Sequence, residues 1–144
     1  CTHLILPDLE VRMALHAAAR GDPAPRVRAE AIAVLARMGR GPDARDLALA
    51  VLRGREEPEV RLVAARTLVL FDARSSPEIR NVCTVLLSGA TSDDLTLELV
   101  RALGAHGNKP DLPILEHVRE RTGNRFLKEA VDAARAAIDK RHPE

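Results

Sequence analysis

Small and aliphatic residues recur at every fourth position in four separate stretches of the chain. A step of four residues advances about 400° around an α-helix, so each series forms one slowly drifting apolar stripe. Successive series are offset by 33, 35 and 31 residues. The four series are Val27, Ala31, Leu35, Gly39; Val60, Ala64, Leu68, Asp72; Leu95, Leu99, Leu103, Gly107; and Phe126, Ala130, Ala134, Ile138. We predict that these stripes, and both phenylalanines (Phe71 and Phe126), face the core.

A second set of helices is predicted between these stretches, each ending near a glycine. Gly21, Gly54, Gly89 and Gly123 are spaced 33, 35 and 34 residues apart. Glycine tolerates the left-handed conformation that often ends a helix, so we expect a C-cap at each position. Proline and a carboxylate mark most helix starts. The combined prediction is eight helices, at about residues 7–20, 25–38, 42–53, 58–71, 77–88, 93–106, 111–122 and 125–140.

Short predicted loops of three to six residues require successive helices to pack as antiparallel neighbours. No strand pattern is found in the sequence. A single helix pair of this length cannot bury its apolar face, whereas stacked pairs can. We therefore predict an all-α repeat domain over residues 7–140, with an N-terminal lead-in over 1–6 and a C-terminal tail over 141–144.

Residues Pro25 to Gly39 have the pattern Pro-x-Val-Arg-x-x-Ala-x-x-x-Leu-x-x-x-Gly, and Pro58 to Asp72 repeat it imperfectly. This pattern is similar to the first helix of short bacterial HEAT repeats of the PBS-lyase type. Tetratricopeptide, armadillo and ankyrin repeats fit less well, because their aromatic positions, their length or their signature box are missing. The resemblance implies a right-handed α–α superhelix in which the second helix of each pair lines the concave, ligand-facing side.

Composition and charge narrow the function only slightly. Apolar residues make up 46% of the chain and aromatic residues 1%, and no apolar run approaches the length of a membrane span. The 22 Lys and Arg nearly balance the 21 Asp and Glu, and the signs alternate locally. A mixed surface of this kind disfavours nucleic-acid binding. Two cysteines do not define a disulfide framework.

No pattern of catalytic or metal-binding residues stands out. The five histidines lack a His-Glu-x-x-His arrangement, no glycine-rich phosphate loop follows a strand, and no serine has a Gly-x-Ser-x-Gly context. Cys83 lies in an apolar helix and is predicted to be a core residue rather than a nucleophile. We predict no catalytic residue, no metal and no cofactor.

The candidate binding residues follow from the HEAT resemblance, which places the second helices on the ligand side. Their polar residues predicted to be exposed are Arg45, Asp46, Arg80, Asn81, Thr84, Glu116 and Arg119. Arg28 and Arg61 share one repeat position, where we expect each to pair with a carboxylate such as Glu30 or Glu59.

The favoured function is a non-catalytic scaffold that binds a protein or peptide, with no nucleic-acid partner. The alternatives are an enzyme of the HEAT-like DNA glycosylase or bilin lyase type and a nucleic-acid-binding module. The chain begins at Cys1, which is either a fragment boundary or the processed, lipid-bearing cysteine of a bacterial lipoprotein. Only the lipidated form would make a membrane a partner and the cell envelope its location; otherwise the protein is expected in the cytoplasm.

Overall fold

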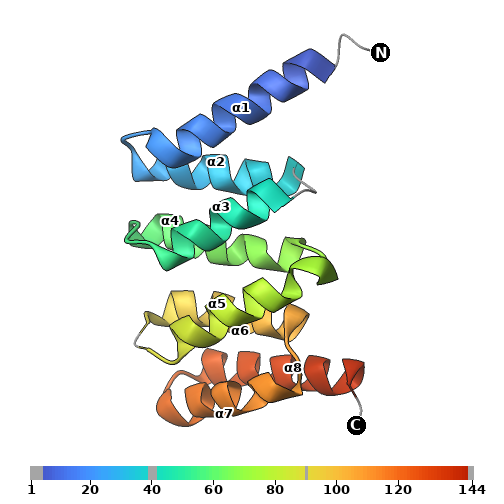
Figure 1. The fold of residues 1–144 in the computed structure, drawn as a ribbon. Helices are drawn as coiled ribbons and strands as arrows, with labels where there is room; N and C mark the ends of the chain where they lie inside the picture. Colours follow the sequence, from blue (N-terminus) through green and yellow to red (C-terminus); the bar gives the residue numbers. More distant parts are fainter. Residues whose placement is uncertain (1–4, 39–41, 90, 143–144) are drawn as a thin grey trace. The chain divides into compact units, whose positions relative to one another are not determined.

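The structure, a computed structural model, describes residues 5–38, 42–89 and 91–142. Within these ranges it contains eight α-helices and no strand (Figure 1). The α-helices are α1 (Ile5–Gly21), α2 (Pro25–Met38), α3 (Pro42–Arg53), α4 (Pro58–Thr67), α5 (Ser76–Leu87), α6 (Asp93–His106), α7 (Leu112–Arg121) and α8 (Arg125–Arg141). Short 3-10 helices cover Leu68–Leu70, Ala73–Ser75 and Lys109–Asp111. The predicted all-α fold and the predicted helix order are confirmed.

The chain divides into two compact units, one ending at Leu70 and the other beginning at Phe71. In the first unit α1 packs on α2, α3 packs on α4, and α2 and α4 pack on each other. In the second unit α5 packs on α6, α7 packs on α8, and α6 and α8 pack on each other. Each unit is therefore a stack of two antiparallel helix pairs, which is the α-solenoid arrangement (Figure 1). The predicted limits of the lead-in and of the tail stay predictions.

The core of the first unit lies where the predicted stripes of α2 and α4 meet. Ala31 and Leu35 are buried in α2, and Ala64 is fully buried in α4, with Leu68 just beyond its end. Alanine at these positions lets two helix backbones approach closely, while leucine fills the remaining space. The four-residue stripes thus place the contact between the two helix pairs as predicted.

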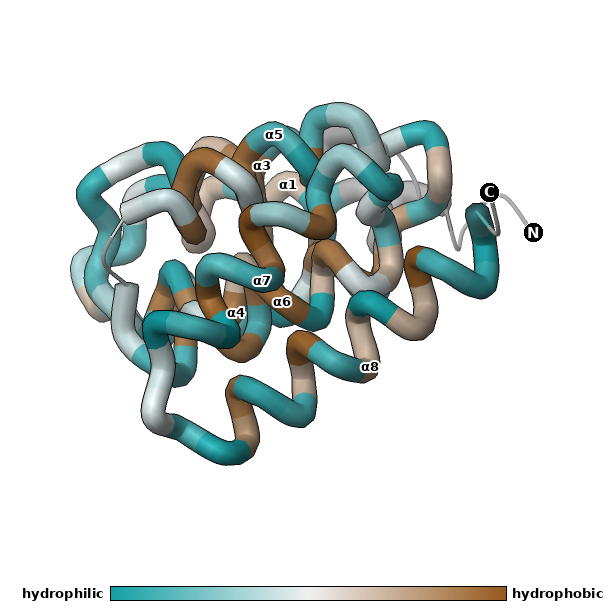
Figure 2. Tube along the Cα trace, turned by 90° about the horizontal axis from the view of Figure 1, so that it is seen from below, coloured by the Kyte–Doolittle hydropathy of each residue, from teal (hydrophilic) through white to brown (hydrophobic). Residues whose placement is uncertain are grey.

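Close packing in the second unit depends on a glycine inside a helix. A side chain at Gly104 of α6 would lie 3.2 Å from the Cα atom of Ala134 in α8. Helix propensity disfavours glycine here, yet its missing side chain allows α6 and α8 to touch. Teal and brown residues alternate along α8 in Figure 2, as expected for a helix with one buried face.

The prediction that Phe126 lies in the core is wrong, because its side chain is 72% exposed. Three steps of about 400° turn its direction by about 120° from that of Ile138, which is fully buried in the same helix. Val27, at the start of its own stripe, is 40% exposed for the same reason. Phe71 is half-buried and follows the end of α4.

Two expectations about helix ends also need correction. No glycine among the described residues has a positive φ, so the glycines end helices without the left-handed conformation. The helix predicted over 58–71 changes to a 3-10 helix after Thr67, whose hydroxyl donates to the carbonyl oxygen of Ala64 at 2.7 Å. A threonine side chain that bonds its own helix backbone competes with the regular hydrogen-bond pattern.

We predict that Ala64→Arg destabilises the protein by at least about 3 kcal/mol, because no solvent reaches this position and the charge would be buried without a partner. Urea unfolding followed by circular dichroism measures the change. Ala14→Arg, on an exposed position of α1, is the control and should stay within about 0.5 kcal/mol of the parent. Equal stability of the two variants would contradict the assigned core.

Candidate functional site

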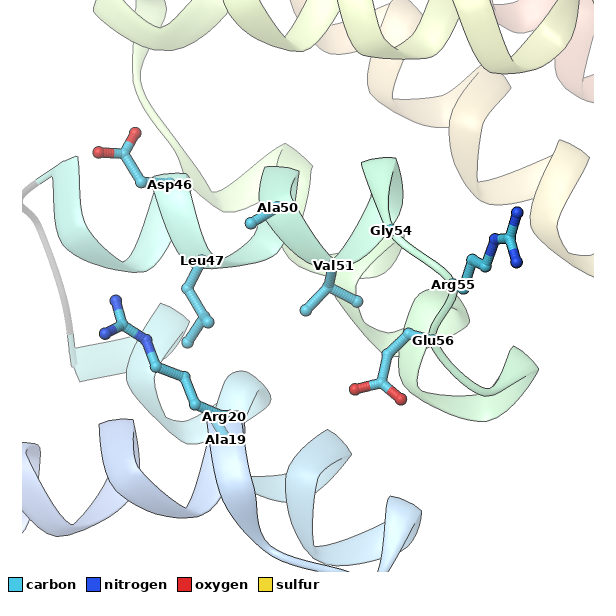
Figure 3. A pocket seen from close by; sticks show the side chains of 9 residues that line it. All are labelled: Ala19, Arg20, Asp46, Leu47, Ala50, Val51, Gly54, Arg55 and Glu56. Atoms are coloured by element: carbon cyan, nitrogen blue, oxygen red, sulfur yellow. The ribbon is translucent and has the colours of Figure 1, made fainter.

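A groove of about 620 Å³ lies between the end of α1 and one side of α3 in the first unit (Figure 3). Both helices belong to the set that ends near the repeat glycines, which is the set predicted to face ligands. The groove is lined by Ala19, Arg20, Asp46, Leu47, Ala50, Val51, Gly54, Arg55 and Glu56. Its volume falls within the range of ligand-sized clefts.

The floor of the groove follows from one stripe of α3. The floor begins at Leu47 and continues at the positions three, four and seven residues later, which are Ala50, Val51 and Gly54. This spacing places all four residues on one helix face. Leu47 and Val51 are largely buried, whereas Ala50 and Gly54 are exposed. The small residues leave open space above the aliphatic ones, so the floor is apolar and accessible.

A cluster around Arg28 fixes the end of the groove where Glu56 lies. Arg28 donates from Nε and Nη2 to the two carboxylate oxygens of Glu56, at 2.9 and 2.7 Å, and from Nη1 to the carbonyl oxygen of Asp22 at 2.7 Å. These hydrogen bonds raise the pKa of Arg28 and hold the pKa of Glu56 below its ordinary value of 4.5. One guanidinium thus joins the loop after α1 to the loop after α3.

The partners expected for the two equivalent arginines were wrong. Arg28 pairs with Glu56, across two loops, rather than with Glu30 or Glu59. Arg61 donates instead to the carbonyl oxygen of Leu52 at 3.1 Å, close to the end of α3. Arg28 therefore holds the loop between α3 and α4 from the neighbouring pair, whereas Arg61 connects α4 to the end of α3 within one pair.

Arg45 and Asp46, two of the predicted binding residues, form a pair with each other. Arg45 donates from Nε and Nη2 to Oδ1 of Asp46 at 3.0 and 2.9 Å. Asp46 lines the groove and its side chain is 60% exposed, whereas that of Arg45 is only 18% exposed. The aspartate is consequently the member of the pair that a partner in the groove would meet.

Two arginines of the groove were missed by the sequence analysis. Arg20 and Arg55 are both exposed, and within the described part of the chain neither makes a hydrogen bond or an ion pair. In Figure 3 the side chain of Arg20 lies beside Leu47, and that of Arg55 lies beyond Gly54. Their signal in the sequence is that each directly adjoins a repeat glycine, Gly21 or Gly54.

In the second unit the predicted binding residue Arg80 is part of the internal structure. It donates from Nε to Oδ2 of Asp111 at 2.6 Å, and this aspartate is 5% exposed. The backbone N–H of Asn108 donates to the same oxygen at 2.8 Å. The pair connects α5 to the 3-10 turn that precedes α7, so Arg80 is held away from a partner.

Glu116 and Arg119 of α7 face α8 rather than an open surface. Arg135 donates to both carboxylate oxygens of Glu116 at 2.9 and 3.0 Å, and Arg119 donates from Nε to Asp132 at 2.9 Å. The hydrogen bond from Arg119 holds the pKa of Asp132 below its ordinary value. These two exposed pairs have opposite polarity, and both connect α7 to α8.

Asn81 and Thr84, the remaining predicted residues, lie three positions apart on α5. Asn81 is exposed and Thr84 is half-buried, with its hydroxyl donating to the carbonyl oxygen of Asn81 at 3.1 Å. They sit on the same helix as Arg80, and α5 contacts α7. Of the five predicted residues in this unit, Asn81 is therefore the one that is exposed rather than half-buried.

Cys83 is a core residue, as predicted. It is fully buried, and burial raises the pKa of its thiol to about 12, so the reactive thiolate is not formed at neutral pH. Within residues 5–38, 42–89 and 91–142 no group of three His, Cys, Asp or Glu side chains could hold a metal ion, and no helix is long and apolar enough to cross a membrane. Cys1, the predicted lipid-attachment residue, lies outside the described residues.

Another groove, of about 500 Å³, lies between the first helices α6 and α8 of the second unit. The exposed ring of Phe126 forms part of its lining, together with Leu97, Ala130 and Ala133. Arg101 and Glu129 add one charge of each sign. The small apolar surface of residues 125–140 was expected to offer a competing site, whereas the exposed ring of Phe126 within it was not expected.

Comparison with known protein families finds one match, to the family of HEAT repeats, over residues 6–68. This segment is therefore similar to HEAT repeats. It spans α1 to α4 and includes the whole α1–α3 groove. HEAT repeats are helical scaffolds capable of protein interaction, and the family is generally non-catalytic. Neither the curated proteins nor the solved structures that were compared match the chain.

We predict that Asp111→Ala destabilises the second unit by about 3 kcal/mol, since it leaves the partly buried charge of Arg80 without its carboxylate. Asp132→Ala removes the partner of Arg119 at an exposed site and should change the unfolding midpoint little. Urea unfolding of both variants, compared with the parent protein, measures the difference. A larger effect from Asp132 than from Asp111 would be incompatible with these environments.

The Arg28–Glu56 pair also predicts an acid dependence of stability. Because the pKa of Glu56 is lower in the folded state, its contribution is complete above about pH 4.5 and is lost as the pH falls through the folded value. The parent protein should therefore be more stable than Glu56→Gln at pH 7, and this difference should shrink in acid. Thermal unfolding of both proteins between pH 7 and pH 3 tests it, and a difference that is independent of pH would refute it.

Proposed function

We propose that this protein is a non-catalytic binding module that holds a protein or peptide segment on the second helices of its HEAT repeats. The observation that carries the proposal is the α1–α3 groove, which lies within the matched repeats and on the helices where ligands are expected. The groove has an apolar floor and a charged rim. Interfaces with proteins commonly combine these two features, with apolar contacts at the centre and polar groups around them.

The rim of the groove is suited to a polypeptide rather than to a small metabolite. Arg20, Asp46 and Arg55 are exposed along its edge, so they can reach groups outside the groove. The floor offers small side chains instead of a deep enclosed cavity, which suits one or two aliphatic side chains of a partner. A chain with further residues on either side could then contact α3 over its length.

The polar surface of α5 extends the proposal to the second unit. Asn81 is exposed and can both donate and accept hydrogen bonds, and Thr84 is adjacent to it. By contrast, the pairs of Arg80 with Asp111 and of Arg119 with Asp132 make these two arginines supports for the helices. Asp46 and Asn81 are therefore the predicted site residues best suited to touch a partner directly.

Selection from a random peptide-display library on the full chain tests the proposal, with affinity of each selected peptide measured by fluorescence anisotropy. We expect peptides that bind saturably and that lose at least about tenfold in affinity on Ala50→Arg, which fills the groove with a long side chain at an exposed position. Ala14→Arg makes the same exchange on an exposed position of α1 outside the groove. A library that yields no saturable binder, or binders weakened equally by both variants, would overturn the proposal.

A further inference from the structure

The charges around the α1–α3 groove do not balance once its internal pairs are taken into account. Four charged side chains line it: Arg20, Asp46, Arg55 and Glu56. Counted alone, these four sum to zero. The sum is misleading, because both acidic residues are already hydrogen-bonded to arginines that lie behind the lining.

Both carboxylates are satisfied from within the protein. Glu56 receives two hydrogen bonds from Arg28, at 2.7 and 2.9 Å, in a forked arrangement. Asp46 receives two from Arg45, both to Oδ1, at 2.9 and 3.0 Å. Each carboxylate together with its arginine adds no net charge to the groove.

Arg20 and Arg55 are the groups that remain uncompensated. Both are exposed, and neither makes an ion pair or hydrogen bond with any other described residue. Toward a ligand the groove therefore carries two positive charges. Arginine presents a planar set of donors that matches a carboxylate, so each side chain is a ready binding point for one.

The two arginines lie at opposite ends of the apolar floor. Arg20 comes from α1 and lies beside Leu47, while Arg55 follows Gly54 at the far end of the stripe (Figure 3). The seven steps from Leu47 to Gly54 span about 10 Å of helix. The floor between the two arginines is therefore about 10 Å long, which leaves room for an apolar group over Ala50 and Val51 between two bound carboxylates.

An extended peptide satisfies this geometry in a specific way. Residues four positions apart project from the same side of an extended chain and are separated by about 13 Å, and the residue midway between them projects on that side too. We propose that the α1–α3 groove binds an acidic peptide segment with two carboxylates four positions apart and an aliphatic residue midway between them. This inference rests on the proposed function and names the chemistry of its partner.

The direct test uses a fluorescein-labelled synthetic peptide with two glutamates four positions apart and a leucine midway, measured against the full chain at physiological salt. We expect saturable binding in fluorescence anisotropy. A peptide with glutamines in place of the glutamates, and one of the same composition with the glutamates adjacent, should each bind at least about tenfold more weakly. Equal binding of the three peptides would overturn the inference.

Charge reversal locates the two contacts. Arg20→Glu and Arg55→Glu should each weaken binding by about tenfold or more, since each replaces an attraction with a repulsion. The matched control is Arg53→Glu, which makes the same charge change on α3 at an exposed residue outside the groove. The decisive arm is a swap, in which the Arg20→Glu, Arg55→Glu double variant binds a peptide with two lysines in place of the glutamates. Circular dichroism of every variant shows that the exposed substitutions leave the helices intact.

The outcomes separate this inference from the function on which it rests. If display yields groove binders that Ala50→Arg abolishes, but the acidic peptide does not bind or is unaffected by Arg20→Glu and Arg55→Glu, the acidic partner is wrong and the binding module stands. If a single-stranded oligonucleotide competes as well as the acidic peptide, the site recognises negative charge alone and the inference fails. If neither selected peptides nor the acidic peptide bind, both proposals fail together.

Discussion

A pair of short helices has an apolar stripe that it cannot cover by itself, and the rest of this structure depends on that constraint. In both units the stripe of one first helix is buried against the next first helix, α2 against α4 and α6 against α8. The contact requires small residues, since fully buried Ala64 and the Gly104–Ala134 approach would admit nothing larger without displacing a backbone. Packing of the first helices leaves the second helices free to form an accessible surface.

Arginine side chains add further contacts between helix pairs to those made by the small residues. Alanine-rich helices bury little side-chain volume, so the loops between them gain few apolar contacts that could hold them. Arg28 joins two loops through Glu56 and Asp22, Arg80 joins α5 to the turn before α7, and Arg141 donates to the carbonyl oxygens of Gly104 and Gly107 at 2.6 and 2.9 Å. Each long side chain reaches the next helix pair and satisfies backbone or carboxylate groups there. Abundant arginine in this sequence thus has a structural use that is unrelated to nucleic acid.

The fold could be predicted from the sequence because its determinants are local and periodic. The series containing Ala64 and Leu68 repeats the series containing Ala31 and Leu35, and the short loops leave only an antiparallel arrangement. The same reasoning failed for Phe126, because a step of four residues drifts by about 40° each turn and the ends of a long stripe leave the buried face. It failed also at Thr67, where a side-chain hydrogen bond decides the helix end.

The candidate site was less predictable, because it depends on which charges are paired in three dimensions. The sequence placed Arg45, Arg80 and Arg119 on the second helices, yet all three have carboxylate partners, at Asp46, Asp111 and Asp132. Two of those partners belong to other elements and cannot be identified from spacing along one helix. Arg20 and Arg55 had no distinguishing feature except their position next to a glycine.

An overall charge near zero therefore says little about any one face of this molecule. The formal charge of the whole chain is +1, but pairing between side chains decides which charges a given face presents. A partner meets the charged side chains that are left unpaired, and in the α1–α3 groove these are Arg20 and Arg55 alone. Pairing removes acidic and basic side chains in equal number, so two exposed arginines are left beside an apolar floor. Arginine therefore has two roles in this structure. It holds loops where the chain itself supplies a carboxylate, and it presents a binding point for a ligand where the chain supplies none.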